Sequence, residues 1–136
     1  MIENQSKNAA PLLEIKDLTV HYETEAGVVE AVNDVSLVLE KGESLALVGE
    51  TGAGKTTIAL SIMKQLPSPP ARIVDGTISL AGNGIFDMSE KELRNVRGST
   101  VSMIFQDPMT ALNPSMRVGD QVAEVIRLHR KCSKAE

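Results

Sequence analysis

The sequence predicts an α/β fold that begins with an antiparallel β meander, and two contrasting strand patterns predict it. Residues 12–22 alternate apolar and polar side chains, as a strand with one buried face does. Residues 44–49, SLALVG, instead form a short and nearly continuous apolar run, which is typical of a parallel strand buried on both faces. We therefore expect an antiparallel N-terminal part joined to a parallel α/β core.

Turn signals divide the first half of the chain into elements. The polar residues 1–10 are expected to form a disordered leader. A polar turn over 23–27 separates the first strand from residues 28–43, which contain one or two further strands. Apolar residues at helical spacing predict a helix over 55–66, and the PSPPA stretch that follows stops it because proline cannot continue a helix.

The next segment carries strand and turn signals, followed by a helix start. Residues 72–82 have the pattern of a strand in which Asp75–Gly76 forms a turn or a bulge, and Asn83–Gly84 is a turn signal. Ser89 and Glu92 have the spacing of a capping box, which predicts a short helix that begins there.

The last third of the chain is expected to hold a strand, a loop and a helix. Residues 99–105 have the pattern of another buried strand, and the prolines and asparagine of residues 106–114 predict a loop. An amphipathic helix is expected over 118–130. The residues that share its apolar face are Val118, Val122, Val125, Ile126 and His129.

Composition and charge restrict the classes of function. The chain has 136 residues, of which 42% are hydrophobic, enough for the core of one ordinary domain. Against 14 basic residues stand 18 acidic ones, a net charge of −4, which argues against a nucleic-acid partner. The single cysteine, Cys132, excludes an intrachain disulfide. No apolar run reaches the roughly 18 residues of a membrane span. The N-terminus also lacks an apolar signal core, so we expect a cytoplasmic location.

The stretch GETGAGKTT, residues 49–57, has the pattern of a phosphate-binding loop. Gly49, Gly54, Lys55 and Thr56 match the spacing G-x-x-x-x-G-K-[ST]. Glycines let successive backbone N–H groups point at one phosphate, and the N-terminus of the following helix adds partial positive charge. Lys55 is expected to reach the β and γ phosphates of ATP, and the Thr56 hydroxyl to bind Mg²⁺. The other loop residues expected to contact the nucleotide are Glu50, Thr51, Gly52, Ala53 and Thr57. A chance match is the alternative, and the apolar run before the loop and the helical pattern after it argue against chance.

Three longer stretches extend the likeness beyond this loop. They are LLEIKDLTVHYET, VVEAVNDVSLVLEKGESLALVGETGAGKTT and MIFQDPMTALNPSMRVGDQVAE. On these stretches the sequence resembles the ATP-binding subunit of an ABC transporter, and within that family the importers of oligopeptides, dipeptides and nickel. The resemblance runs from about Leu12 to Arg130. Its last stretch is the most specific, because a P-loop alone also fits kinases, GTPases and many other ATPases.

The resemblance implies roles for two further residues. Tyr22 falls where the family has an aromatic side chain that stacks on adenine, an interaction worth on the order of 1–3 kcal/mol per base. The alternative for Tyr22 is a tyrosine at a strand end with a half-buried ring. Gln106 falls at the family's Q-loop glutamine, which helps to hold Mg²⁺ or the attacking water, and whose loop touches the membrane partner. The alternative for Gln106 is a polar loop residue that follows a strand. Catalytic roles are thus implied for Lys55 and Gln106.

The family's other hydrolytic motifs are not found in these 136 residues. They are a signature motif close to LSGGQ, an apolar strand followed by Asp-Glu, and a later histidine near the γ-phosphate. The resemblance places the missing strands between those of residues 44–49 and 99–105. We therefore expect these two segments to lack their normal neighbours and the fold to be marginal. The chain alone is expected to bind ATP without hydrolysing it at a useful rate.

The leading hypothesis is the N-terminal part of an importer ATPase. Residues 11–113 would form the first part of an ABC nucleotide-binding domain, and residues 114–136 the start of its helical subdomain, truncated before the rest. The whole subunit would dimerise head to tail and bind transmembrane permease subunits through the loop Gln106–Pro114, at the inner face of the cell membrane. It would couple ATP hydrolysis to the uptake of peptides or a related small solute. One alternative is a short form that only binds nucleotide or a partner. Another is a DNA-repair ATPase of the wider family, against which the acidic balance and this loop argue.

Overall fold

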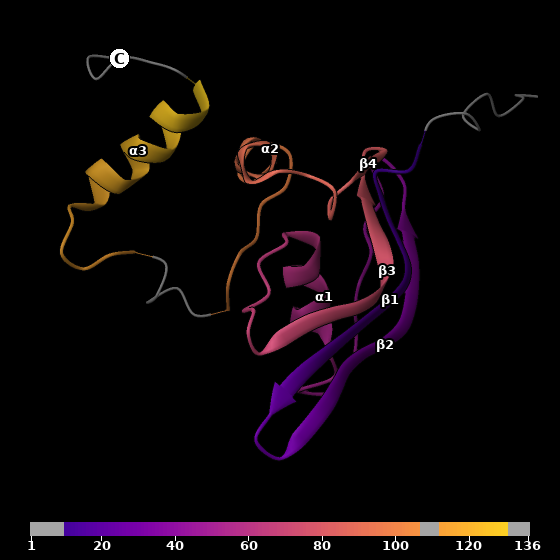
Figure 1. The fold of residues 1–136 in the computed structure, drawn as a ribbon. Coiled ribbons are helices and arrows are strands. Elements are labelled where there is room, and N and C mark those ends of the chain that lie inside the picture. The colour runs from indigo at the N-terminus through magenta and orange to yellow at the C-terminus, as the bar shows by residue number, and fades with distance from the viewer. Residues whose placement is uncertain (1–9, 107–111, 131–136) are drawn as a thin grey trace, which may run out of the picture. The chain divides into compact units, whose positions relative to one another are not determined.

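The computed structural model describes residues 10–106 and 112–130, and Figure 1 shows their elements. The chain folds into two compact units that divide between Met88 and Ser89. The first unit holds strands β1 (Leu13–Thr24), β2 (Gly27–Leu39), β3 (Ala71–Leu80) and β4 (Asn83–Gly84), and helix α1 (Lys55–Ile62). The second unit holds helices α2 (Glu90–Val96) and α3 (Val118–Arg130). Nearly all of the expected leader, and Cys132, lie outside the described residues.

The strands form one antiparallel sheet in the order β2-β1-β3-β4. β1 and β2 form a hairpin with its turn at Glu25–Ala26, so the antiparallel N-terminal part is confirmed. The sheet is not a simple meander, however. The chain leaves β2, passes through the glycine-rich loop and α1, and only then adds β3 to the free edge of β1.

A bulge at Asp17 keeps one side of β1 on the core. Ile15 is buried before the bulge and Leu18 after it, so the apolar alternation shifts by one residue without leaving the core face. Asp17 has a φ of 51°, and Gly76 opposite it on β3 has a φ of 93°. A Cβ on Gly76 would lie 2.6 Å from the Asp17 carbonyl oxygen, so only glycine fits there. The irregularity predicted at Asp75–Gly76 is confirmed, although the extra residue belongs to β1.

Helix α1 is shorter than predicted. It ends at Ile62 because Lys64 adopts a φ of 48° and turns the chain away. The Gln65 N–H donates to the Leu60 carbonyl at 2.9 Å and the Lys64 N–H to the Ser61 carbonyl at 3.0 Å, which is the Schellman pattern. Glycine is the usual residue at the left-handed position of that motif, so a lysine there gives no stop signal in the sequence.

The turn after β3 lies two residues before the turn predicted at Asn83–Gly84. Ala81 and Gly82 have φ values of 48° and 79°, as a two-residue hairpin turn of the primed type requires. Asn83 and Gly84 form β4 instead, and they pair with Leu80 and Ser79.

Two predicted strands are wrong. Residues 44–49 have no strand partner among the described residues, and Val48 is 94% exposed. Residues 99–105 contain a single bridge, from Val101 to Arg97, and Ile104 is 97% exposed. An apolar run fixes which face could be buried, but a strand also needs a neighbour for its backbone N–H and C=O groups. Apart from that single parallel bridge, neither segment pairs with a strand within the described residues, so the expected parallel core is not formed there.

Helix α2 begins at its predicted capping box. The Glu92 N–H donates to the Ser89 hydroxyl oxygen at 3.4 Å, and the Ser89 N–H donates to the Glu92 carboxylate at 2.8 Å. The Ser89 hydroxyl also donates to that carboxylate, at 2.6 Å. These donors, the hydroxyl first and the backbone N–H second, hold the pKa of Glu92 below its ordinary value of 4.5.

Helix α3 forms over the predicted residues, and Gln121 fixes the chain that leads into it. The Gln121 amide oxygen accepts from the Asn113 N–H at 2.8 Å. The Gln121 amide nitrogen donates to the carbonyls of Asn113 at 3.0 Å and Met116 at 3.1 Å. Four of the predicted apolar-face residues are exposed: Val118, Val122, Val125 and Ile126. Within residues 10–106 and 112–130, no helix has both the length and the apolar character needed to cross a bilayer.

Candidate phosphate-binding site

The glycine-rich loop connects the exposed segment 44–49 to the N-terminus of α1. Gly52 and Gly54 take left-handed φ values of 87° and 79°, and the Ala53 N–H donates to the Glu50 carbonyl at 3.2 Å. Gly54 is the N-cap of α1. No side chain caps this fully described helix and its first turn holds no acidic residue, so its first backbone N–H groups face no competing carboxylate. The N-terminus of α1 can therefore accept an anion.

Gly54 lies directly against β2. A Cβ at Gly54 would clash with the carbonyl oxygen of Ala31 and would lie 3.3 Å from Cγ2 of Val32. Ala31 is the extra residue of a β-bulge, because β1 pairs with Glu30 and with Val32 but skips Ala31. The absence of a side chain at Gly54 is what allows the loop to approach the sheet this closely.

Lys55 folds back onto the loop that precedes it. Its Nζ donates to the carbonyl oxygens of Gly49 and Glu50, each at 2.6 Å. Both are charge-assisted hydrogen bonds, and they hold the ammonium group against the loop. Two of the three ammonium donors are thus bound to backbone carbonyls, and a phosphate that takes either of these two must replace a carbonyl.

Thr56 and Thr57 differ in exposure although they are neighbours in the first turn of α1. Thr56 is exposed, whereas Thr57 is buried and its carbonyl accepts the Ser61 hydroxyl at 2.7 Å. The described part of the chain has no group of three or more His, Cys, Asp or Glu side chains placed to hold a metal ion. Thr56 thus presents one exposed hydroxyl in the first turn of α1, a group of the kind that could hold Mg²⁺ together with phosphate oxygens and water.

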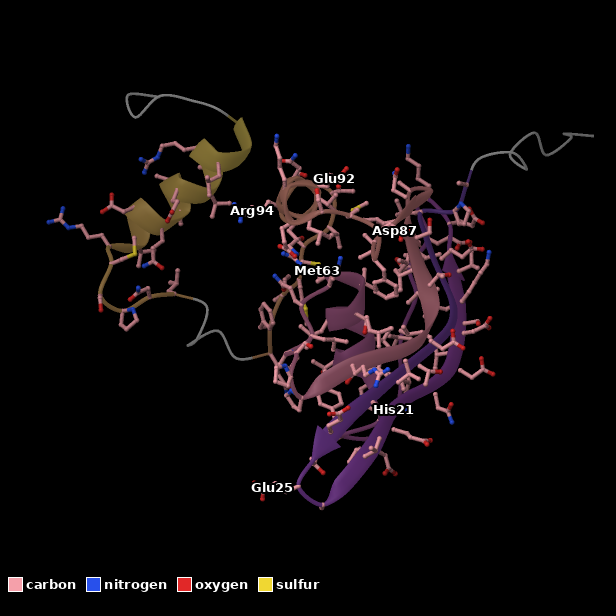
Figure 2. All side chains as sticks on the ribbon, in the orientation of Figure 1. His21, Glu25, Met63, Asp87, Glu92 and Arg94 are labelled. Carbon is pink, nitrogen blue, oxygen red and sulfur yellow. The ribbon has the colours of Figure 1, made fainter. Side chains whose placement is uncertain are left out.

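Tyr22 lies on the same face of the sheet as the contact between Gly54 and β2. It is half-buried on β1, in register with Val29 on one side and Ala71 on the other. Val20, two residues earlier, pairs with Val32, and strand residues two apart share a face about 7 Å from each other. The intervening His21, labelled in Figure 2, alternates to the opposite face. An aromatic ring at Tyr22 is thus on the side of the sheet where the loop docks.

Gln106 belongs to the second unit, where it is exposed. Residues 107–111 of the loop expected to contact a partner, Met109 among them, lie outside the described residues. The described end of that loop, Leu112 to Pro114, is exposed and is held by the hydrogen bonds between Asn113 and Gln121.

Ala31 and Val32 were missed from the sequence as part of the site. Their role comes from a bulge that meets a glycine far along the chain, and neither residue has a local pattern that reports such an approach. The bonds from Lys55 to Gly49 and Glu50 were also missed, because the motif assigns that lysine to phosphates alone.

The glycine loop, the helix behind it and the sheet on which it rests define a P-loop protein. A family model described as ABC transporter matches residues 32–136. The chain belongs to the ABC transporter family, as the resemblance implied.

Two curated relatives have names that describe peptide transport. The chain is 50% identical over 123 residues to the oligopeptide transport ATP-binding protein OppD of Bacillus subtilis (strain 168), covering 90% of this chain and 34% of that protein. It is 47% identical over 123 residues to the dipeptide transport ATP-binding protein DppD of the same strain, with coverages of 90% and 37%. The chain thus spans about a third of the length of these relatives.

Among solved structures, a dimeric post-hydrolysis state of the ATP-binding cassette MJ0796 bound to ADP and Pi is similar in fold. The TM-score is 0.57 at 17% identity, covering 85% of this chain and 54% of that chain. This likeness confirms the fold class. At 17% identity it shows the fold and nothing about function.

Proposed function

We propose that this chain is the ATP-binding part of an ABC importer subunit that drives the uptake of peptides or a related small solute. The observation that carries the proposal is the loop at residues 49–57, with left-handed Gly52 and Gly54, Lys55 held against it and an uncapped helix behind it. The printed names of the relatives, which describe oligopeptide and dipeptide transport, support the choice of solute class.

Each residue of the loop then has a task. The backbone N–H groups of the loop and of the first turn of α1 hold the phosphates, and Lys55 transfers its two donors from Gly49 and Glu50 to phosphate oxygens. The Thr56 hydroxyl holds Mg²⁺, which neutralises phosphate charge when bound. Tyr22 stacks on the base from the same face of the sheet.

The proposal assigns further roles within the whole subunit. Gln106 would act in catalysis and bind Mg²⁺ or the attacking water. The loop Gln106–Pro114 would contact the permease, and a second ATPase subunit would complete the site. These assignments place the subunit at the inner face of the cell membrane. For the chain by itself, we propose nucleotide binding. In the alternative, a short form that only binds nucleotide or a partner, that binding would not be coupled to transport.

Titration with a fluorescent ATP analogue tests the site. Lys55→Ala removes the one side-chain ammonium held at the loop, so we expect a loss of ATP affinity of more than about tenfold, equivalent to about 1.4 kcal/mol. Lys16→Ala is the control, because that lysine is an exposed residue of β1 paired only with Glu14 at 3.0 Å among the ion pairs described. Equal affinity in the parent and Lys55→Ala would rule out the site.

A further inference from the structure

We propose that Val32, together with the bulge at Ala31, is a positioning residue that holds the phosphate loop in its binding conformation. The inference rests on the proposed function, because the loop that it positions is the one that would bind the phosphates of ATP. Neither residue would touch the nucleotide, so their effect on binding would act through Gly54.

The contact is tight and lies next to the start of the binding helix. Val32 is 4% exposed, and its Cγ2 and the Ala31 carbonyl occupy the space into which a Cβ on Gly54 would point. α1 begins at Lys55, the next residue. The position of this surface therefore sets where the first N–H groups of the helix point.

The other described contacts of the loop hold its shape but do not fix its position on the sheet. Lys55 bonds to Gly49 and Glu50, and Ala53 bonds to Glu50, so these hydrogen bonds all lie within the loop. On the N-terminal side the chain is exposed up to Glu50, including Val48 at 94%. The surface formed by Ala31 and Val32 is thus a point at which the glycine loop meets the sheet ahead of α1.

A binding loop loses affinity when a surface that supports it recedes. Binding of a phosphate requires several N–H groups to converge on it, and a preorganised loop avoids the cost of ordering them. Truncation of Val32 removes two methyl groups under Gly54 and lets the loop relax. We expect Val32→Ala to weaken the binding of inorganic tripolyphosphate by about fivefold or more, since small misplacements of binding groups carry large penalties.

The matched control is Val20→Ala. Val20 is the cross-strand partner of Val32 and is fully buried, but it is not among the atoms nearest to Gly54. Each variant removes two methyl groups from one member of the same cross-strand pair, so both should lower the midpoint of thermal unfolding. Only Val32→Ala should lose tripolyphosphate affinity in calorimetric titrations. Val32→Thr keeps the branched shape while adding a buried hydroxyl, so it should lose stability and keep affinity.

Equal loss of affinity in Val32→Ala and Val20→Ala, or parental affinity in Val32→Ala, would overturn the inference. If Val32→Ala does not fold, Val32→Ile and Val20→Ile replace the alanine pair, because an added methyl beneath Gly54 should displace the loop only from position 32. Amide hydrogen exchange of residues 49–57 without ligand provides a second measurement. Exchange should be faster in Val32→Ala than in Val20→Ala, and equal rates would refute the positioning role. A parent that binds no tripolyphosphate would refute the proposed function, and the exchange comparison would still decide on the positioning role.

Discussion

Alanine at Gly54 and alanine at Gly52 should differ sharply in their cost, although the two glycines have nearly the same backbone conformation. Their φ values are 79° and 87°, so either substitution places an L-residue in the left-handed region. That conformation costs roughly 1–2 kcal/mol for a residue with a Cβ. At Gly52 nothing lies within 4 Å of the added Cβ, so this is the whole expected loss.

At Gly54 the added Cβ also meets the Ala31 carbonyl and Cγ2 of Val32. The carbonyl is backbone in a paired strand and cannot rotate away as a side chain would. Overpacking of this kind costs about 1–3 kcal/mol. We therefore expect Gly54→Ala to lower the free energy of unfolding by roughly 2–5 kcal/mol, against roughly 1–2 kcal/mol for Gly52→Ala.

Urea denaturation followed by circular dichroism measures the difference. The chain has no tryptophan and a single tyrosine, so backbone ellipticity is a better signal than fluorescence. Equal losses in the two variants, with unchanged denaturant slopes, would show that the close approach to Ala31 contributes nothing and would refute the reasoning.

Three further predictions concern α2, α3 and catalysis. Because the pKa of Glu92 is lowered, the stability that its carboxylate gives to α2 should be complete above about pH 4.5 and be lost as the pH falls through the lowered pKa. The difference in stability between the parent and Glu92→Gln, followed by circular dichroism, should therefore shrink in acid. A difference that stays constant with pH would contradict this. Gln121→Ala should accelerate amide exchange at Asn113, whereas Gln121→Glu keeps the acceptor oxygen and should preserve protection there. An exchange rate in Gln121→Ala equal to that of the parent would show that the Gln121 side chain does not protect the Asn113 amide. With Mg-ATP the chain alone should release little phosphate, and steady turnover near 1 s⁻¹ that disappears in Lys55→Ala would prove this expectation wrong.

Local signals predicted the parts of the fold whose causes are local. The capping box of Ser89 and Glu92 lies within one turn of helix, and the apolar periodicity of α3 is contained in the helix itself. The glycine spacing of residues 49–57 likewise predicted a loop, because the left-handed conformations of Gly52 and Gly54 are ones that glycine favours.

The predictions that were wrong or missing concern structure that depends on distant partners or on uncommon backbone conformations. Residues 44–49 and 99–105 have strand-like composition, but pairing is decided by neighbours that lie elsewhere in the chain. Lys64 ends α1 in a conformation that sequence rules assign to glycine. The contact of Ala31 with Gly54 joins a bulge to a loop, and only the folded sheet brings them together.

Under the proposed function, the hydrogen bonds of Lys55 would make nucleotide entry an exchange of partners rather than a simple encounter. Two of the three ammonium N–H donors are bound to the Gly49 and Glu50 carbonyls, so a phosphate that takes those two donors replaces partners within the protein as well as water. Both acceptors are backbone atoms, which no side-chain substitution at position 49 or 50 can delete. A change in the curvature of the loop, rather than a different side chain at position 49 or 50, would therefore alter these two bonds.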